Sequence, residues 1–187
     1  MAAPTPSLAC VWRRLDTPGL EWCRFDRSGI RGSLLVVLDG NPRLVTYAIR
    51  RDRDWLTRGA TVEIEDGSGR RRLALRVDGH GRWFAGRRPL DWAQRLLDVD
   101  LGVTPSTNTL PIRRLQLSVG KSAELTAVWV HFPSLEVRPL AQRYTRLGPS
   151  TYRYQSLVDG KVRFSARLSV DRDGAVQRYA RLFQRVA

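Results

Sequence analysis

Apolar and polar residues alternate along most of the chain. The segment "KVRFSARLSVD" (161–171) places an apolar residue at every second position, at Val162, Phe164, Ala166, Leu168 and Val170. Successive side chains of a strand point to opposite faces, so this pattern predicts a strand with one buried face and one solvated face. Segments 43–51 and 60–66 alternate in the same way.

Short turn motifs separate these segments. Asp-Gly pairs stand at residues 39–40, 66–67, 78–79, 159–160 and 173–174. Such pairs supply the positive φ angles and local hydrogen bonds that tight hairpins require. The spacing predicts about eleven strands, antiparallel pairing and very little helix, which together define an all-β protein.

Two segments are apolar on both faces. "SLLVVL" (33–38) is continuously apolar, and "AELTAVWVHF" (123–132) carries apolar residues at both odd and even positions. Such strands are expected to be covered on both sides. In a single sheet this cover requires a second layer, strong curvature, or apolar material in the concavity.

The strand pattern is interrupted between residues 86 and 115. Trp92, Leu96 and Leu97 in this segment are spaced to form a short helical turn. The interruption separates an N-terminal meander (8–84) from a C-terminal meander (120–186). Because the segment is rich in apolar residues, we interpret it as a structured crossover within one domain spanning residues 1–187, a length that suits a single core.

The chain is strongly basic, with 32 Lys and Arg against 18 Asp and Glu, a formal net charge of +14. This charge makes binding of nucleic acid or another polyanion an alternative function. The arginines are spread along the whole chain, however, rather than gathered in one arm or helix. That distribution favours solvated strand faces.

Catalytic motifs are not found in the sequence. It contains no G-x-S-x-G elbow, no phosphate-binding loop, and no His or Cys spacing typical of a metal site. Asp98 and Asp100 share one side of an extended backbone, so a hydrolase or isomerase using this pair or Glu21 remains an alternative. We otherwise expect no catalytic residue, metal or cofactor, and buried free thiols at Cys10 and Cys23.

The sequence predicts neither a secretory signal at its start nor a membrane span. The opening "MAAPTPSLAC" lacks a basic segment followed by a long apolar one, and no apolar run approaches the roughly 18 residues of a membrane span. A cytoplasmic location is therefore the expectation.

Binding of an amphipathic molecule is the remaining function class. A concave sheet can bury acyl chains, while hydroxyl groups, tyrosines and arginines at its rim hold a polar head. Candidates for the apolar lining are Leu35, Val37, Tyr47, Val128 and Trp129. The sequence does not determine which face of each strand points inward. Candidates for the polar rim are Asp98, Asp100, Thr107, Asn108, Arg113, Arg143, Tyr152 and Tyr154.

Several motifs resemble one bacterial family. They are "WRRLDTPGLE" (12–21), "DVDLGVTPSTNTLPIRRL" (98–115), "QRY" (142–144), "YRY" (152–154) and "YARLFQR" (179–185). In this order they resemble the family designated "putative glycolipid-binding", formerly a family of unknown function. The resemblance implies an open, strongly curved antiparallel half-barrel, similar to periplasmic carriers of lipids and lipoproteins. It also implies binding of a glycolipid or lipid. Because no catalytic motif is found, we expect this binding to be non-enzymatic.

Overall fold

The computed structural model describes residues 8–187, so most of the opening stretch, from which the sequence predicts no export signal, lies outside the described residues. The N-terminal strands are β1 (Leu8–Arg14), β2 (Gly19–Asp26), β3 (Gly29–Leu38), β4 (Asn41–Arg51), β5 (Thr57–Asp66), β6 (Gly69–Val77), β7 (Trp83–Ala85) and β8 (Arg88–Pro89). The C-terminal strands are β10 (Ser122–Val130), β11 (Val137–Gly148), β12 (Thr151–Val158), β13 (Lys161–Val170), β14 (Val176–Tyr179) and β15 (Phe183–Arg185).

A connecting stretch runs between the two groups of strands. It contains the 3-10 turn η1 (Asp91–Ala93), the strand β9 (Asp98–Leu101), the 3-10 turn η2 (Ser106–Asn108) and the helix α1 (Thr109–Leu115). Of the residues expected in a helical turn, only Trp92 lies in η1. Within the described residues no helix is long and apolar enough to cross a membrane.

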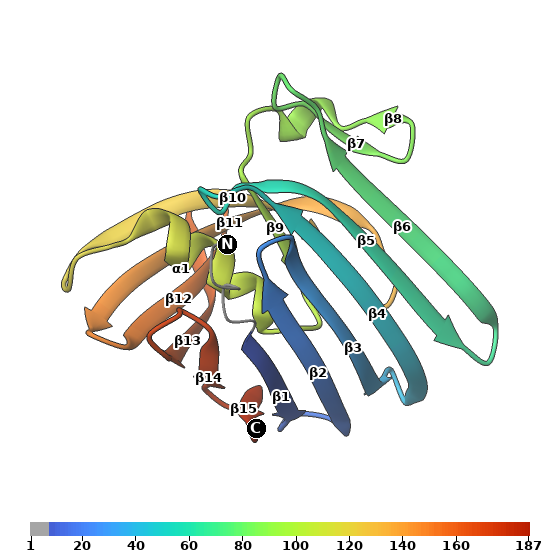
Figure 1. Ribbon diagram of the computed structural model, residues 1–187, viewed down its shortest axis with the longest axis horizontal. Coiled ribbons are helices and arrows are strands. Elements are labelled where there is room, and N and C mark those ends of the chain that lie inside the picture. Colours follow the sequence, from blue (N-terminus) through green and yellow to red (C-terminus); the bar gives the residue numbers. More distant parts are fainter. Residues whose placement is uncertain (1–7) are drawn as a thin grey trace, which may run out of the picture.

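All described strands belong to one open sheet (Figure 1). The all-β class, antiparallel pairing and scarcity of helix are confirmed, but the described chain has fifteen strands rather than about eleven. The extra strands include β7, β8, β14 and β15, which have four residues or fewer and so carry too little alternation to be predicted. Neighbouring strands are antiparallel except for β9 and β10, which are parallel.

The two halves of the sheet join where the ends of the chain meet. β1 pairs with β15, and β9 forms the far edge of the C-terminal half. Strong curvature brings this edge back to the N-terminal half, where the Thr57 amide donates to the Leu97 carbonyl at 2.9 Å. The Thr57 hydroxyl oxygen also accepts a hydrogen bond from the Val99 amide at 3.1 Å. The curved sheet thereby encloses a core.

Two predicted hairpin turns are confirmed in their backbone geometry. Asp39 and Gly40 join β3 to β4 with φ angles of 50° and 74°, and Asp159 and Gly160 join β12 to β13 with φ angles of 51° and 72°. Two consecutive positive φ angles give the turn a twist that matches that of the paired strands.

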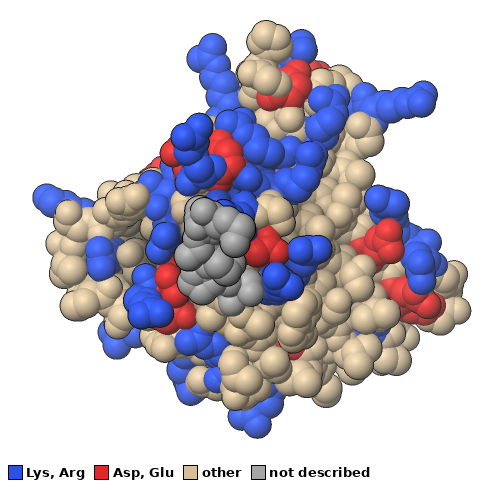
Figure 2. All heavy atoms as spheres, viewed as in Figure 1, with Lys and Arg blue, Asp and Glu red and all other residues tan. Residues whose placement is uncertain are grey.

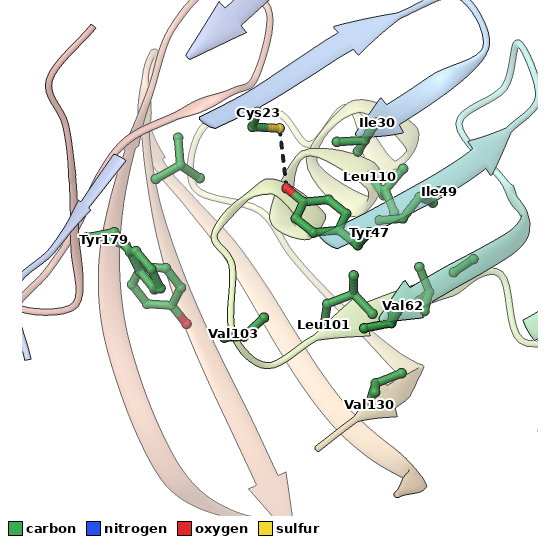
Figure 3. Close-up of a cluster of buried hydrophobic side chains, with 14 of the residues drawn as sticks. Cys23, Ile30, Tyr47, Ile49, Val62, Leu101, Val103, Leu110, Val130 and Tyr179 are labelled. Atoms are coloured by element: carbon green, nitrogen blue, oxygen red, sulfur yellow. Dashed lines mark hydrogen bonds between the residues drawn. The ribbon is translucent and has the colours of Figure 1, made fainter. Parts of the chain in front are cut away.

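The connecting stretch fills the interior of the curved sheet. Figure 3 shows side chains from this stretch packed among those of the N-terminal strands, namely Leu101, Val103 and Leu110 among Ile30, Ile49 and Val62. Val128 and Val130 of β10 are also buried, and Trp129 is partly buried. The expectation that residues 123–132 are covered on both faces therefore holds around Val128.

The expectation is wrong for residues 33–38. Leu34 and Val36 face the core, whereas Leu35 is 66% exposed and Val37 is only partly buried on the outer face. Leu35 and Val37 therefore do not line the concavity, and their prediction as lining residues is wrong. The pairing of Leu34 with buried Val45 fixes which face of β3 points inward.

Gly32 makes room for the side chain of Tyr47. The two residues are paired across β3 and β4, and a Cβ atom built on Gly32 would lie only 2.4 Å from Cζ of the Tyr47 ring. Tyr47 is 4% exposed, and its hydroxyl group is bonded to Glu21 and Ser106, so moving the ring would break buried hydrogen bonds. The missing side chain at residue 32 thus sets the position of the Tyr47 hydroxyl group.

We expect Gly32→Ala to destabilise the fold by about 1–3 kcal/mol, because overpacking a full core forces side chains from their preferred positions. Urea denaturation monitored by circular dichroism measures this change. Gly67→Ala is the matched control, since a Cβ atom there would have no neighbour within 4 Å. Equal stability of the two variants would contradict the role assigned to Gly32.

Candidate functional site

Short polar contacts shape the backbone of the connecting stretch. The Ser106 amide donates to the Thr104 hydroxyl oxygen at 3.0 Å, and the Asn108 side-chain amide donates to the Pro105 carbonyl at 3.1 Å. Such local side-chain bonds favour turns over extended strand. Pro111 lies in the first turn of α1, where a missing N–H costs nothing. The segment therefore turns within the sheet instead of extending it.

The first polar cluster lies on the side of the N-terminal strands. Glu21 is 1% exposed, and its Oε1 atom accepts hydrogen bonds from the hydroxyl groups of Tyr47 at 2.5 Å and Thr104 at 2.6 Å. The Tyr47 and Ser106 hydroxyl oxygens are 2.8 Å apart. This Glu21 cluster (Glu21, Tyr47, Thr104, Ser106) joins β2 and β4 to the connecting stretch.

The environment of Glu21 favours the protonated form of its carboxyl group. Burial raises its pKa from 4.5 to about 7, against the lowering effect of the hydrogen bonds from Thr104 and Tyr47 and of the nearby Arg14 charge. Its Oε2 atom has no hydrogen-bond partner among the described residues. An ionised carboxylate with an unpartnered buried oxygen is costly, which explains the direction of the shift.

The second polar cluster lies on the side of the C-terminal strands. Asp100 accepts hydrogen bonds from the Thr107 hydroxyl at 3.1 Å and from the Gln142 side-chain amide at 2.6 Å. Burial raises the pKa of Asp100 from 3.8 to about 6, and the neighbouring Asp98 charge adds to the shift. The Tyr144 hydroxyl donates to Asn108 Oδ1 at 2.9 Å.

Asp98 forms an ion pair with Arg114 and shares no hydrogen-bond partner with Asp100. Arg114 of α1 holds Asp98 through two hydrogen bonds, at 3.2 Å and 2.5 Å, and the Asp98 side chain is 3% exposed. Burial still raises the pKa of Asp98, although the Arg114 guanidinium opposes the shift. The two acids thus have different partners and do not form an isolated carboxylate pair.

Aromatic rings surround the second polar cluster. Tyr154 lies 5.3 Å from Tyr144, 6.1 Å from Phe164 and 5.9 Å from Tyr179, measured between ring centroids. Burial raises the pKa of Tyr154 and Tyr179, and the Asp100 charge adds to both shifts. Phe164 is 38% exposed, so this group of rings reaches solvent at β13. We call Asp100, Gln142, Tyr154, Phe164 and Tyr179 the tyrosine–aspartate site.

The structure brings some of the predicted rim residues together. Asp98, Asp100, Thr107 and Asn108 lie side by side on β9 and η2, and Tyr154 joins them through Tyr144. Asp98, Thr107 and Asn108 are buried and bonded within the protein. Of the predicted rim residues, Tyr154 lies against the exposed Phe164, and Asp100 is partly exposed and bonded to Gln142.

The other three predicted rim residues lie elsewhere. Arg143 pairs with Glu124 at 2.6 Å, away from the buried Gln142 and Tyr144 that flank it on β11. Arg113 lies over the Trp55 ring at 5.0 Å, and Tyr152 is buried beneath Arg146 at 5.7 Å. Among the predicted lining residues, Tyr47 is buried but belongs to the Glu21 cluster.

Sequence reasoning did not single out Gln142, Tyr179 or the buried role of Glu21. Gln142 and Tyr144 are two residues apart on β11 and therefore share its inward face. This spacing is visible in the sequence and could have identified Gln142. Cys10 and Cys23 stand directly opposite each other on β1 and β2 as buried free thiols, as predicted. Among the described residues no three His, Cys, Asp or Glu side chains are placed to hold a metal ion.

Comparison with known proteins identifies the family. A family model described as "Putative glycolipid-binding" matches residues 9–185. This chain belongs to that family. It is also similar to a crystal structure of a DUF1089 family protein from Pseudomonas aeruginosa, with 36% identity and a TM-score of 0.82 over 100% of this chain and 95% of that one. No curated protein matches the chain.

The tyrosine–aspartate site combines hydrogen-bonding groups with aromatic rings. Carboxylate and amide groups hydrogen-bond hydroxyl groups, and aromatic rings pack against apolar surface while Tyr keeps a polar tip. The Glu21 cluster is enclosed, and Gln142, Tyr154 and Tyr179 are also buried. The tyrosine–aspartate site differs because Phe164 is exposed and Asp100 is partly exposed. The hydrogen bonds of the Glu21 cluster join residues of the protein to one another.

The pKa of Glu21 predicts a stability change with pH. The unfolded chain releases this proton near pH 4.5 and the folded protein near 7, so the proton stabilises the fold fully below pH 4.5. That contribution, about 3 kcal/mol, is lost as the pH rises from 4.5 through 7. Glu21→Gln should flatten the loss between pH 6 and 8 in urea denaturation.

Asp100→Asn serves as the matched control. Its own contribution is lost between pH 3.8 and about 6, so this variant should keep the decline above pH 6. An unchanged decline in Glu21→Gln would show that Glu21 is not the group responsible.

Proposed function

We propose that this protein binds an amphipathic molecule, a glycolipid or a lipid with a hydroxyl-rich head, and does so without catalysing a reaction on it. One observation carries the proposal. The inner face of the C-terminal strands gathers aromatic rings around a carboxylate and an amide, and one of these rings, Phe164, is 38% exposed.

The polar groups of the site suit hydroxyl groups of a head group. Each carboxylate oxygen of Asp100 already accepts one hydrogen bond. Each can accept another, because a carboxylate oxygen has more than one lone pair. The Asp100 pKa of about 6 leaves this side chain mostly ionised at neutral pH and able to accept further hydrogen bonds. Sugar hydroxyl groups are suitable donors for such an acceptor.

The apolar part of the ligand would pack on the aromatic rings. Each buried methylene group contributes about 0.8 kcal/mol, so a few groups against the exposed Phe164 give measurable affinity. The connecting stretch already occupies much of the concavity, with Leu101 and Leu110 fully buried there. We therefore assign the ligand to the C-terminal half of the concavity rather than to its whole length.

Native mass spectrometry of protein purified from bacterial cells, before and after incubation with a bacterial lipid extract, tests this function. We expect a bound lipid mass in the wild type and at least about a ten-fold loss of bound fraction in Phe164→Ala, from the lost apolar contact. Arg143→Gln is the control, because Arg143 pairs with Glu124 away from the site. Lipid-free spectra of the wild type under both conditions would refute the proposal.

A further inference from the structure

The outer face of the N-terminal half carries an exposed apolar surface. We define the outer apolar patch as Leu20, Trp22, Leu35 and Leu44, whose exposed fractions are 53%, 48%, 66% and 39%. Leu20 pairs with Leu35, and Leu35 pairs with Leu44, so one apolar row crosses three strands. Trp22 lies two residues beyond Leu20 on the same face of β2. Contiguous exposed apolar surface of this kind marks an interaction site.

The apolar row continues into a shallow hollow. It has a volume of about 610 Å³ and is lined by Pro18, Gly19, Leu20, Leu35, Val36, Val37 and Pro42, with Arg13, Arg14 and Arg43 at its sides. Arg13 is exposed, stands opposite Leu20, and has no ion-pair partner among the residues that the structure describes. Apolar residues thus form the floor. Arg14 and Arg43 pair with Asp16 and Asp66, so Arg13 supplies the exposed positive charge beside the hollow.

More positive charge borders the other side of the patch. Arg24 and Arg31 stand opposite each other on β2 and β3, with side chains 45% and 58% exposed. They share a single acid, Asp26, at 3.7 Å and 3.0 Å, so this border has an excess of positive charge. Figure 2 shows uncharged surface over β2 to β5, bordered by basic side chains and, on the side of β6, by acidic side chains as well. There Glu65 stands opposite Leu44 and pairs with Arg70.

We propose that the outer apolar patch docks this protein onto the surface of an anionic lipid bilayer. Aliphatic side chains and a tryptophan would enter the boundary between head groups and acyl chains, where tryptophan is favoured. Arg13, Arg24 and Arg31 would contact the anionic head groups around them. An arginine near such a surface strengthens binding about five-fold.

A bilayer fits this face better than a second copy of the chain does. The sheet wraps around its core, so its outer face is convex (Figure 1), and two convex faces touch over a small area only. Each copy also carries a formal net charge of +14, which opposes self-association. A fluid, negatively charged surface can instead follow the curvature and complement the charge.

This docking is independent of ligand binding in the concavity. The patch and the tyrosine–aspartate site lie on opposite faces of the sheet and on different halves of the chain. A variant can therefore lose bilayer docking and still bind a lipid in solution. Another variant can lose lipid binding and still dock onto a bilayer.

Sedimentation with vesicles tests the proposal. We expect the wild type to bind vesicles of phosphatidylcholine mixed with phosphatidylglycerol more tightly than vesicles of phosphatidylcholine alone, with weaker binding as salt increases. Leu35→Glu should weaken binding to the mixed vesicles at least about ten-fold, and Arg13→Gln about five-fold. Val162→Glu is the matched control, an exposed aliphatic residue on β13 with 43% exposure, and should bind like the wild type.

Three results would overturn it. The first is no sedimentation of the wild type with mixed vesicles. The second is an equal effect of Leu35→Glu and Val162→Glu, which would leave only nonspecific attraction of a basic protein. The third is a concentration-dependent dimer in analytical ultracentrifugation that Leu35→Glu abolishes, which would assign the patch to self-association.

Discussion

The interior of a strongly curved sheet has to be filled, and here it is filled by a segment that brings polar as well as apolar side chains into the core. Residues 98–115 bring acids, hydroxyl groups and an amide into the concavity. Burying such groups costs free energy unless they find partners. The strands supply those partners from both sides, Glu21 and Tyr47 from the N-terminal half, and Gln142 and Tyr144 from the C-terminal half. The connecting stretch therefore holds the two halves together.

This filling also decides where function can lie. On the N-terminal side the inner face is closed around Glu21, while on the C-terminal side the rings around Asp100 reach solvent at Phe164. The same sheet presents an apolar outer face at Leu35. A single sheet thus offers two surfaces with different chemistry, one polar and aromatic within the concavity, and one aliphatic and arginine-bordered outside.

Much of the fold follows from local patterns. Alternation in residues 161–171 identifies β13, and the Asp-Gly pair that precedes it identifies the turn, because a side-chain period of two and a pair of positive φ angles are local properties. The unusual composition of residues 98–115 identifies the family. The shortest strands escape prediction, since three residues such as Phe183–Arg185 form a strand only when a neighbour supplies hydrogen bonds.

The candidate site depended on the tertiary structure. The sequence determined which side chains share a face of each strand, for example that Arg143 lies on the opposite face from Gln142 and Tyr144. It could not determine which face points inward, because Leu34 and Leu35 are equally apolar and period-two alternation is the same for both. Only the pairing of β3 with β4, and the packing of residues 98–115 against Tyr47, placed Leu34 in the core and Leu35 in solvent. Contacts between residues far apart in the chain make that choice, and no local pattern contains them.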